Sequence, residues 1–137
     1  MSAEQVLRVW FDRLWTRRDP SVIDELFVPA GRATGLHEHQ AIGPKEFHAF
    51  FQLMTGALAE TRCDIEQIMT HGEHALVLLR FQGRHVASGK GVDVHVGAHA
   101  RIVDGKIVEA TNVIDFLGLL QQIGELPADV LVTALSK

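Results

Sequence analysis

The sequence contains one cysteine, no tyrosine and no cluster of basic residues. A single Cys63 cannot form an intramolecular disulfide bond, which suits a reducing compartment. No apolar run is long enough to cross a bilayer, and the first residues do not lead from a basic segment into an apolar one. We therefore expect a cytoplasmic protein that has no membrane partner.

The charge of the chain does not indicate a nucleic-acid partner. The net charge of −4 comes without a stripe of Lys and Arg, so the sequence gives no electrostatic footprint for binding nucleic acid. Arg17 and Arg18 are the densest basic pair, and their position indicates that they complement a helix dipole. The 137 residues show no linker or internal repeat, which predicts a single domain over residues 1–137.

Helical periodicity dominates the first part of the chain. Ser2 and Gln5 form a potential capping box for a helix that carries Trp10 inward and ends near Arg18. Asp19 and Pro20 are typical of a helix start, and this short second helix should stop before Pro29. A short extended piece is expected over residues 33–40, and Pro44 begins a third helix with one apolar stripe: Phe47, Phe50, Phe51, Met54 and Leu58.

Strand patterns follow the helices. Alternating residues and turn signals predict strands over residues 63–70, 75–85, 92–103 and 106–114. Asp115 should cap a short helix that ends at Gly124, and Pro127 should begin a terminal amphipathic turn. Four antiparallel strands after three helices indicate an α+β domain whose curved sheet closes over the helices and leaves a cavity.

The pair Asp104-Gly105 lies between two apolar runs and is a strong hairpin signal. A two-residue turn that pairs Val103 with Lys106 would bury the carboxylate of Glu109, so we expect a three-residue loop with Gly105 in the left-handed region. The expected pairs on the apolar face are Ile102 with Val108, Ala100 with Ala110, Ala98 with Asn112 and Val96 with Ile114. Asn112 is then the one polar group on this face, and leaving it unpaired would cost on the order of 1–3 kcal/mol.

This C-terminal segment carries a family resemblance. Asp104-Gly-Lys-Ile-Val-Glu109, Asn112, Asp115 and Leu117-Gly-Leu-Leu-Gln-Gln-Ile-Gly124 resemble the hairpin and helix of SnoaL-like proteins in the nuclear transport factor 2-like superfamily. Other segments occur in the same order in that family: residues 10–14, Arg18-Asp19-Pro20, Gly43-Pro44 to Phe51, and the hairpin region at Gly83. The resemblance implies a cone-shaped, curved antiparallel sheet wrapped around N-terminal helices, an architecture of the cystatin-like α+β barrel type.

The resemblance also implies an activity and shows where this chain departs from it. In SnoaL-like cyclases the position of Asn112 is an Asp that acts as acid and base, and the position of Ala98 is a His. An amide cannot take up a proton near neutral pH, so Asn112 would either orient a ligand or simply bond a buried backbone group. The steroid isomerases of the superfamily use a tyrosine and two acids, where this chain has Phe11, Gly35 and Ala98. No Asp-Arg-Asp set of the epoxide hydrolases is visible.

His37 is the second candidate catalytic residue. The resemblance puts it on a short strand at the pocket mouth, where an imidazole can act as a base without a shifted pKa, and the alternative is a solvated rim residue. His39 would share its face, with Glu38 on the other. The spacing of His37 and His39 permits a metal site, but no third ligand is evident, so we expect no metal and no cofactor. Cys63 is expected to be an inert core thiol.

Two function classes and a third, conditional possibility remain open at this point. One is a cofactor-independent enzyme that resembles polyketide cyclases, of the cyclase or isomerase type of lyase, acting on a hydrophobic or aromatic polyketide-like substrate. The other is a non-catalytic protein that binds a small apolar ligand, and a purely structural module would follow if aromatic side chains filled the cavity. The expected pocket residues are Trp10, Phe11, Phe51, Val96, Ala98 and Ile114. The outer strand face, with Asp93, His95, His99 and Arg101, is expected to be solvated or to form a homodimer.

Overall fold

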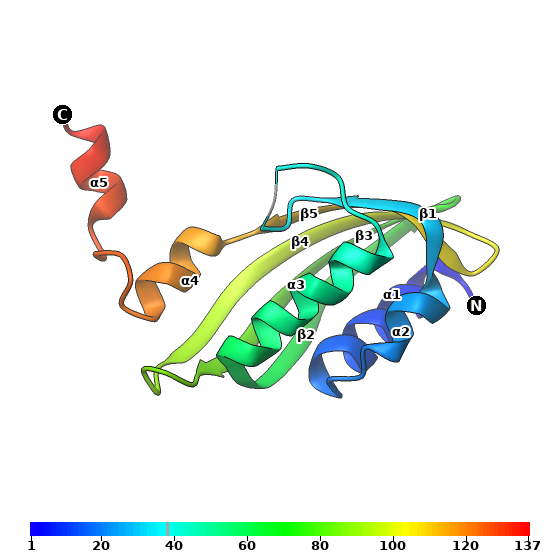
Figure 1. Ribbon diagram of the computed structural model, residues 1–137. Coiled ribbons are helices and arrows are strands. Elements are labelled where there is room, and N and C mark those ends of the chain that lie inside the picture. Colours follow the sequence, from blue (N-terminus) through cyan, green and yellow to red (C-terminus); the bar gives the residue numbers. More distant parts are fainter. Residues whose placement is uncertain (38) are drawn as a thin grey trace.

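The computed structural model describes residues 1–37 and 39–137, so Glu38 lies outside the described residues. The chain folds into a curved five-stranded sheet, and the helices α1, α2 and α3 cover its concave face (Figure 1). The sheet stays open, because β1 and β2 are its two edges. The predicted α+β class, with a curved sheet around N-terminal helices, is confirmed.

The first helical segment changes its winding partway. Helix α1 (Ala3–Phe11) begins at the predicted capping box, in which the Ser2 hydroxyl accepts the backbone N–H of Gln5 and the Gln5 side chain accepts the N–H of Ser2. A π-helical turn, η1 (Asp12–Thr16), continues it. The backbone carbonyl of Trp15 accepts a hydrogen bond from the buried hydroxyl of Thr61 at 2.6 Å, which ties this turn to the sheet.

Arg18 joins the helical layer to the sheet. Its backbone is in the left-handed region (φ 54°), and its guanidinium donates to the carbonyls of Thr55 and Leu58 at 2.9 and 3.0 Å. These carbonyls lie at the end of helix α3 (Pro44–Ala57). A cation there complements the helix dipole. The sequence prediction that Arg18 complements the helix preceding it is therefore wrong, because its guanidinium binds the end of α3 instead.

The segment after α2 (Ser21–Leu26) differs from the prediction. Strand β1 (Phe27–Thr34) begins directly after this helix and pairs in parallel with β5, so the sheet has a fifth strand that the sequence did not indicate. The extended piece predicted over residues 33–40 is wrong beyond Thr34, where the chain bends. Pro29, which the sequence predicts to follow the helix end, fits β1 because an edge strand tolerates a residue without an N–H donor.

The other four strands form the predicted antiparallel meander. They are β2 (Leu58–His71), β3 (His74–His85), β4 (Gly91–Val103) and β5 (Lys106–Ile114). Two register shifts interrupt β2 against β3, and Glu60 at the first of them has a positive φ of 57°. Bulges of this kind bend a strand and increase its twist, which helps the sheet to curve around α1 and α3.

The β4–β5 hairpin reaches the predicted register by another route. Val103 pairs with Lys106 across a two-residue turn, in which Asp104 and Gly105 both have positive φ (52° and 74°). The predicted three-residue loop and the pairing of Ile102 with Val108 are wrong, since Ile102 pairs with Ile107. A bulge one pair further along restores the remaining predicted pairs: Ala100 with Ala110, Ala98 with Asn112 and Val96 with Ile114.

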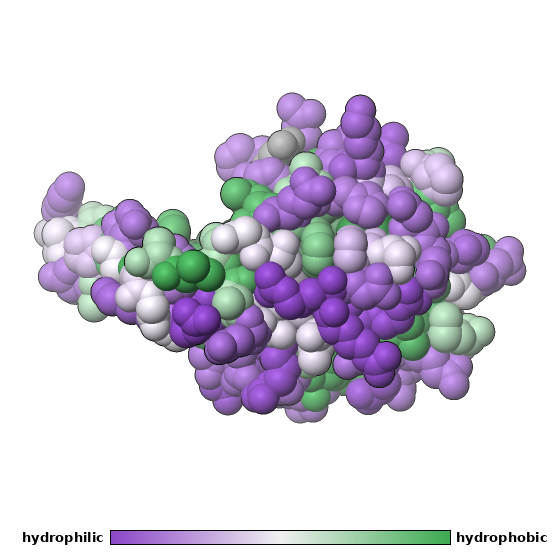
Figure 2. Space-filling view, turned by 60° about the horizontal axis from the view of Figure 1, so that its bottom comes forward, coloured by the Kyte–Doolittle hydropathy of each residue, from purple (hydrophilic) through white to green (hydrophobic). Residues whose placement is uncertain are grey.

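The C-terminal residues leave the body of the domain. Asp115 accepts the N–H of Gly118 at 2.8 Å and caps α4 (Phe116–Gln122), as predicted. Helix α5 (Val130–Leu135) then projects away from the sheet, and Figure 2 shows apolar surface on this protrusion. Its exposed apolar side chains are Leu131, Val132 and Leu135. None of the helices among the described residues is both long and apolar enough to span a membrane.

A charge network at the start of α2 should make folding sensitive to acid. Asp19 accepts hydrogen bonds from Ser21 and, at 2.9 Å, from Arg13, and these bonds lower the pKa of its carboxyl from 3.8 to about 2. A depressed pKa stabilises the fold above about pH 3.8, and this contribution is lost as the pH falls toward 2. Asp19→Asn should therefore lower stability at pH 7, and its difference from the native protein should shrink between pH 4 and pH 2.

Urea denaturation at pH 7, pH 4 and pH 2 measures this difference. Asp129→Asn is the matched control, because the Asp129 side chain makes no capping hydrogen bond to α5, and we expect it to leave the stability at pH 7 unchanged. A gap between native protein and Asp19→Asn that stays constant from pH 7 to pH 2 would contradict the assignment.

Candidate functional site

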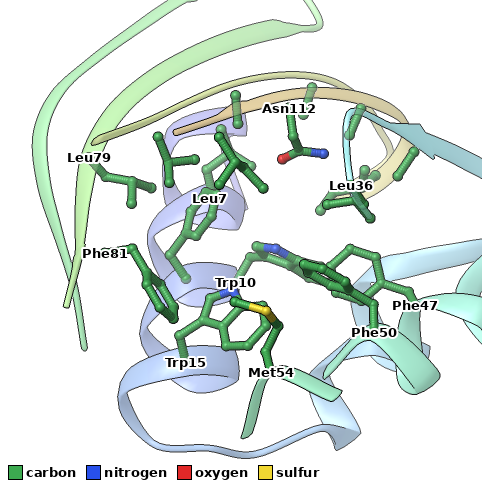
Figure 3. A pocket seen from close by; sticks show the side chains of 18 of the residues that line it. Leu7, Trp10, Trp15, Leu36, Phe47, Phe50, Met54, Leu79, Phe81 and Asn112 are labelled. Carbon is green, nitrogen blue, oxygen red and sulfur yellow. The ribbon is translucent and has the colours of Figure 1, made fainter. Parts of the chain in front are cut away.

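An apolar cavity lies between the concave face of the sheet and the helices α1, η1 and α3 (Figure 3). Its empty space amounts to about 820 Å³, including the part that opens to solvent. The lining side chains come from every layer of the fold, and they include Leu7, Trp10, Phe11, Trp15, Leu36, Phe47, Phe50, Met54, Leu79, Phe81, Val94, Val96, Ala98, Asn112 and Ile114. Aromatic side chains do not fill this space. The hypothesis of a purely structural module required a filled cavity, so the structure does not support it.

The helical wall of the cavity is aromatic, and one of its rings packs against Phe81 of the sheet. Trp10 meets Phe47 edge to face with 5.3 Å between ring centroids, and Trp15 meets Phe81 in the same way at 5.5 Å. Each tryptophan is only 6 % exposed. Edge-to-face packing of this kind holds the rings in fixed orientations. The wall therefore presents flat, rigid apolar surfaces to whatever occupies the cavity.

Asn112 is the polar side chain that the sheet contributes. It lies on β5 opposite Ala98, and its amide nitrogen donates to the backbone carbonyl of Thr34 on β1 at 3.0 Å. Only the nitrogen of a carboxamide can bond a carbonyl oxygen, so this contact decides which way the amide is turned. Figure 3 shows the Asn112 oxygen on the cavity side and its nitrogen toward Leu36.

Gly35 makes this contact possible. The chain turns off β1 at Gly35 with a φ of 79°, and a Cβ built there would lie 1.7 Å from the backbone oxygen of Asn112. No other residue type tolerates both the positive φ and this approach. A glycine at position 35 is thus required for Thr34 to lie beside Asn112.

Two indole N–H groups also lie at the cavity. The nitrogens of Trp10 and Trp15 are visible at the cavity in Figure 3. Among the described residues neither N–H has a hydrogen-bond partner, yet no buried polar side-chain atom is left unsatisfied, so both nitrogens reach open cavity space. Buried indole N–H groups usually have a partner. These two donors are available to a ligand.

The cavity carries no formal charge in the part of the chain that the structure describes. No Asp, Glu, Lys or Arg lines it. His99 borders it, but His99 alternates along β4 with the buried Ala98 and Ala100, and its ring bonds to His74 on the outer face. Burying a charge without a partner is very costly, so the cavity suits uncharged molecules.

The structure brings together most of the residues expected at the pocket. Trp10, Phe11, Val96, Ala98 and Ile114 line the cavity with Asn112. The other two expected residues lie beside it.

Phe51 packs behind the wall, with its ring 5.5 Å from that of Trp15. His37 is exposed in the bend after β1, and its ring stacks on Phe50 at 5.2 Å. Phe50 lines the cavity, but His37 itself does not.

Several lining residues were not singled out as site residues from the sequence. Phe47, Phe50 and Met54 follow the apolar stripe of α3, and helical spacing could have found them, because the stripe faces the same space as Trp10. Thr34 had no signal in its side chain, since it acts through a backbone carbonyl. Its role depends on the parallel β1–β5 pairing, which only the structure reveals.

Two other reactive residue types are placed away from the cavity. Nδ1 of His74 and Nε2 of His99 lie 2.8 Å apart on the outer sheet face, a pairing that the sequence did not indicate. Burial raises the pKa of the Cys63 thiol, with a smaller contribution from Asp64, so Cys63 is a poor nucleophile. Within the described residues, no group of three or more potential metal ligands occurs.

Comparison with known proteins identifies the class. A family model described as SnoaL-like polyketide cyclase matches residues 5–123. No curated protein matches the sequence. A SnoaL-like protein from Jannaschia sp. CCS1, assigned as a polyketide cyclase, has a similar structure (TM-score 0.80, 23% identity, 91% of this chain and 93% of that chain).

Two Streptomyces structures are also similar. AclR from Streptomyces galilaeus, assigned as a hydroxylase, gives a TM-score of 0.81 at 21% identity over 98% of this chain and 89% of its own. IdmH from Streptomyces antibioticus, assigned as a polyketide cyclase, gives a TM-score of 0.81 at 16% identity over 90% of this chain and 99% of its own. At these identities the structures establish the fold, whereas the family model covers most of the chain. The chain belongs to the SnoaL-like polyketide cyclase family.

The open space beside Ala98 can be tested by enlarging this residue. Ala98 is 5 % exposed and lines the cavity, whereas Ala75 is 1 % exposed on β3 and does not. Overpacking a filled core costs about 1–3 kcal/mol. We expect Ala75→Leu to lose about this much stability and Ala98→Leu to lose much less, because its new atoms enter empty space. Urea denaturation of both variants measures this, and equal losses would show that no usable space lies beside Ala98.

Proposed function

We propose that this protein is a cofactor-independent enzyme of the polyketide cyclase type, acting on a hydrophobic aromatic or polyketide-like substrate. The observation that carries this proposal is a rigid, uncharged cavity with one carboxamide aimed into it. The similar proteins from Jannaschia and Streptomyces antibioticus that are assigned as polyketide cyclases support it. A further neighbour of this fold, from Catenulispora acidiphila, was crystallised with trimethylamine, so that protein accepts a small molecule.

In this proposal His37 and Asn112 divide the catalytic work. His37 is stacked on Phe50, and its neutral imidazole takes a proton from the carbon next to a substrate carbonyl. Asn112 orients the substrate in the cavity. The side chain of Asn112 is itself held in one orientation by its hydrogen bond to the carbonyl of Thr34. The resulting carbanion attacks a second carbonyl of the same substrate to close a ring, and the protonated His37 returns its proton to the product oxygen.

A second candidate is a non-catalytic binding protein, which is suggested by the chemistry of two facing residues. Ala98 and Asn112 face each other on β4 and β5, and neither can exchange a proton near neutral pH. Among the described lining residues, no carboxylate replaces them. Such a protein would bind the same class of ligand and leave it unchanged.

The substitution His37→Ala separates the two candidates. For an enzyme, we expect kcat for cyclisation of an aromatic polyketide ester to fall about 10²–10⁴-fold, the usual contribution of a general base, with KM little changed. Product formation is followed by chromatography. His39→Ala is the matched control, since it removes a nearby exposed histidine. Unchanged kcat in His37→Ala would remove His37 as the base, and saturable binding without turnover by the native chain would establish the binding protein.

We also propose that the protein forms a homodimer through the outer face of its sheet. Leu78, Gly97 and Val113 are consecutive partners across β3, β4 and β5, and Leu78 and Val113 are 47 % and 72 % exposed. Met69 and Leu76 form the next pair on the same face and are also exposed. A contiguous exposed apolar patch is typical of an interaction site, and a self-complementary patch forms a two-fold dimer.

The substitution Leu78→Glu tests this dimer. It places a carboxylate in the apolar patch, next to its symmetry-related copy if the patch lies on the two-fold axis, so we expect the variant to be monomeric. Light scattering after gel filtration measures the mass. Leu131→Glu on α5 is the control and should remain dimeric. A native protein that is monomeric, or a Leu78→Glu variant that stays dimeric, contradicts this interface.

We further infer a cytoplasmic location. Cys63 is a lone thiol, and proteins of reducing compartments keep such thiols unpaired. Fractionation of cells that produce the tagged protein would place it in the soluble cytoplasmic fraction, and recovery from another compartment would overturn this inference.

A further inference from the structure

The orientation of Asn112 restricts which ligand the cavity can hold. Its amide nitrogen is used by the carbonyl of Thr34, and its oxygen faces the cavity. No hydrogen bond to that oxygen is formed among the described residues. The sheet therefore offers the ligand an acceptor, whereas an acid at this position, as in the family's cyclases, would exchange a proton with it.

An acceptor in apolar surroundings requires a donor from the ligand. Leaving the Asn112 oxygen without one in an occupied, water-free cavity would cost a full hydrogen bond. A ligand N–H or O–H supplies this donor, but a ketone, an ether or a hydrocarbon does not. The cavity thus discriminates between ligands of the same shape by the presence of a hydroxyl or N–H proton.

The indole groups favour a hydroxyl over a bare N–H. Trp10 and Trp15 present N–H donors to the same cavity, so the ligand also needs an acceptor. A hydroxyl both donates one hydrogen bond and accepts others, which an aromatic N–H does not. The uncharged lining disfavours a carboxylate, a phenolate or an ammonium group.

From these contacts we propose that the cavity selects an uncharged aromatic alcohol, of the phenol or naphthol kind, whose hydroxyl donates to the Asn112 oxygen. The proposal rests on the proposed function only in that a ligand occupies this cavity, and it holds for both the enzyme and the binding protein. The edge-to-face aromatic wall supplies flat surfaces for the ring system. Asn112 is then a specificity-determining residue, because its oxygen accepts the hydrogen bond from the ligand hydroxyl.

Two probe molecules of nearly equal shape test this selection. 2-Naphthol carries the hydroxyl, and 2-methylnaphthalene replaces it with a methyl group. Equilibrium dialysis gives the Kd of each for the native protein, for Asn112→Leu, and for Thr111→Val, whose side chain is exposed on the opposite face of β5. Asn112→Leu keeps similar volume and removes the acceptor. Circular dichroism confirms that each variant is folded.

We expect the ratio of the two Kd values to identify the contact. In the native protein and in Thr111→Val, 2-naphthol should bind more tightly than 2-methylnaphthalene. In Asn112→Leu this preference should fall by at least about tenfold, as expected when a buried acceptor is removed, mainly through weaker binding of 2-naphthol. A preference that survives in Asn112→Leu would overturn the role of Asn112.

The outcomes also separate this proposal from the proposed function. If the native protein binds neither probe, the cavity is not a ligand site and the proposed function fails. If it binds both equally, or prefers the hydrocarbon, the cavity is a ligand site but hydroxyl selection is wrong. Should Asn112→Leu fail to fold, the preference of the native protein between the two probes still decides the proposal.

Discussion

The hydrogen bond from Asn112 to the carbonyl of Thr34 is the contact on which the chemistry of this cavity depends. It joins β5 to the edge strand β1, fixes which atom of the carboxamide faces inward, and exists because Gly35 lets the backbones approach. The other walls of the cavity are apolar or offer only indole donors. One backbone carbonyl thereby converts an ambiguous amide into an acceptor of defined direction.

Much of the fold could be predicted because its signals are local. The capping box at Ser2, the helix start at Pro44 and the alternation along β4 each depend on residues close in sequence, and the structure confirms them. Strand β1 was not predicted, because its parallel pairing with β5 joins segments far apart in the sequence. In addition, Pro29 within β1 is a residue that usually marks the end of a helix. The hairpin register was nearly right because burial decides it, although the bulge lies beyond the turn.

The site was predictable to the extent that it follows the pleat of the sheet. Alternation alone placed Val96, Ala98, Asn112 and Ile114 on one inward face, where the structure has them. It could not show what Asn112 bonds, since its partner is a backbone atom 78 positions away. The position of His37 depends on a bend whose side-chain contacts, such as the stacking on Phe50, are tertiary.

The long separation between β1 and β5 also bears on how the molecule assembles. Strands β2 to β5 follow one another along the chain and can pair through short loops, whereas docking β1 must close a much longer loop at a greater entropic cost. We expect β1 to dock last during folding and to detach first in the native ensemble. Transient loss of this edge would widen the existing opening of the cavity and give a larger guest a route into it.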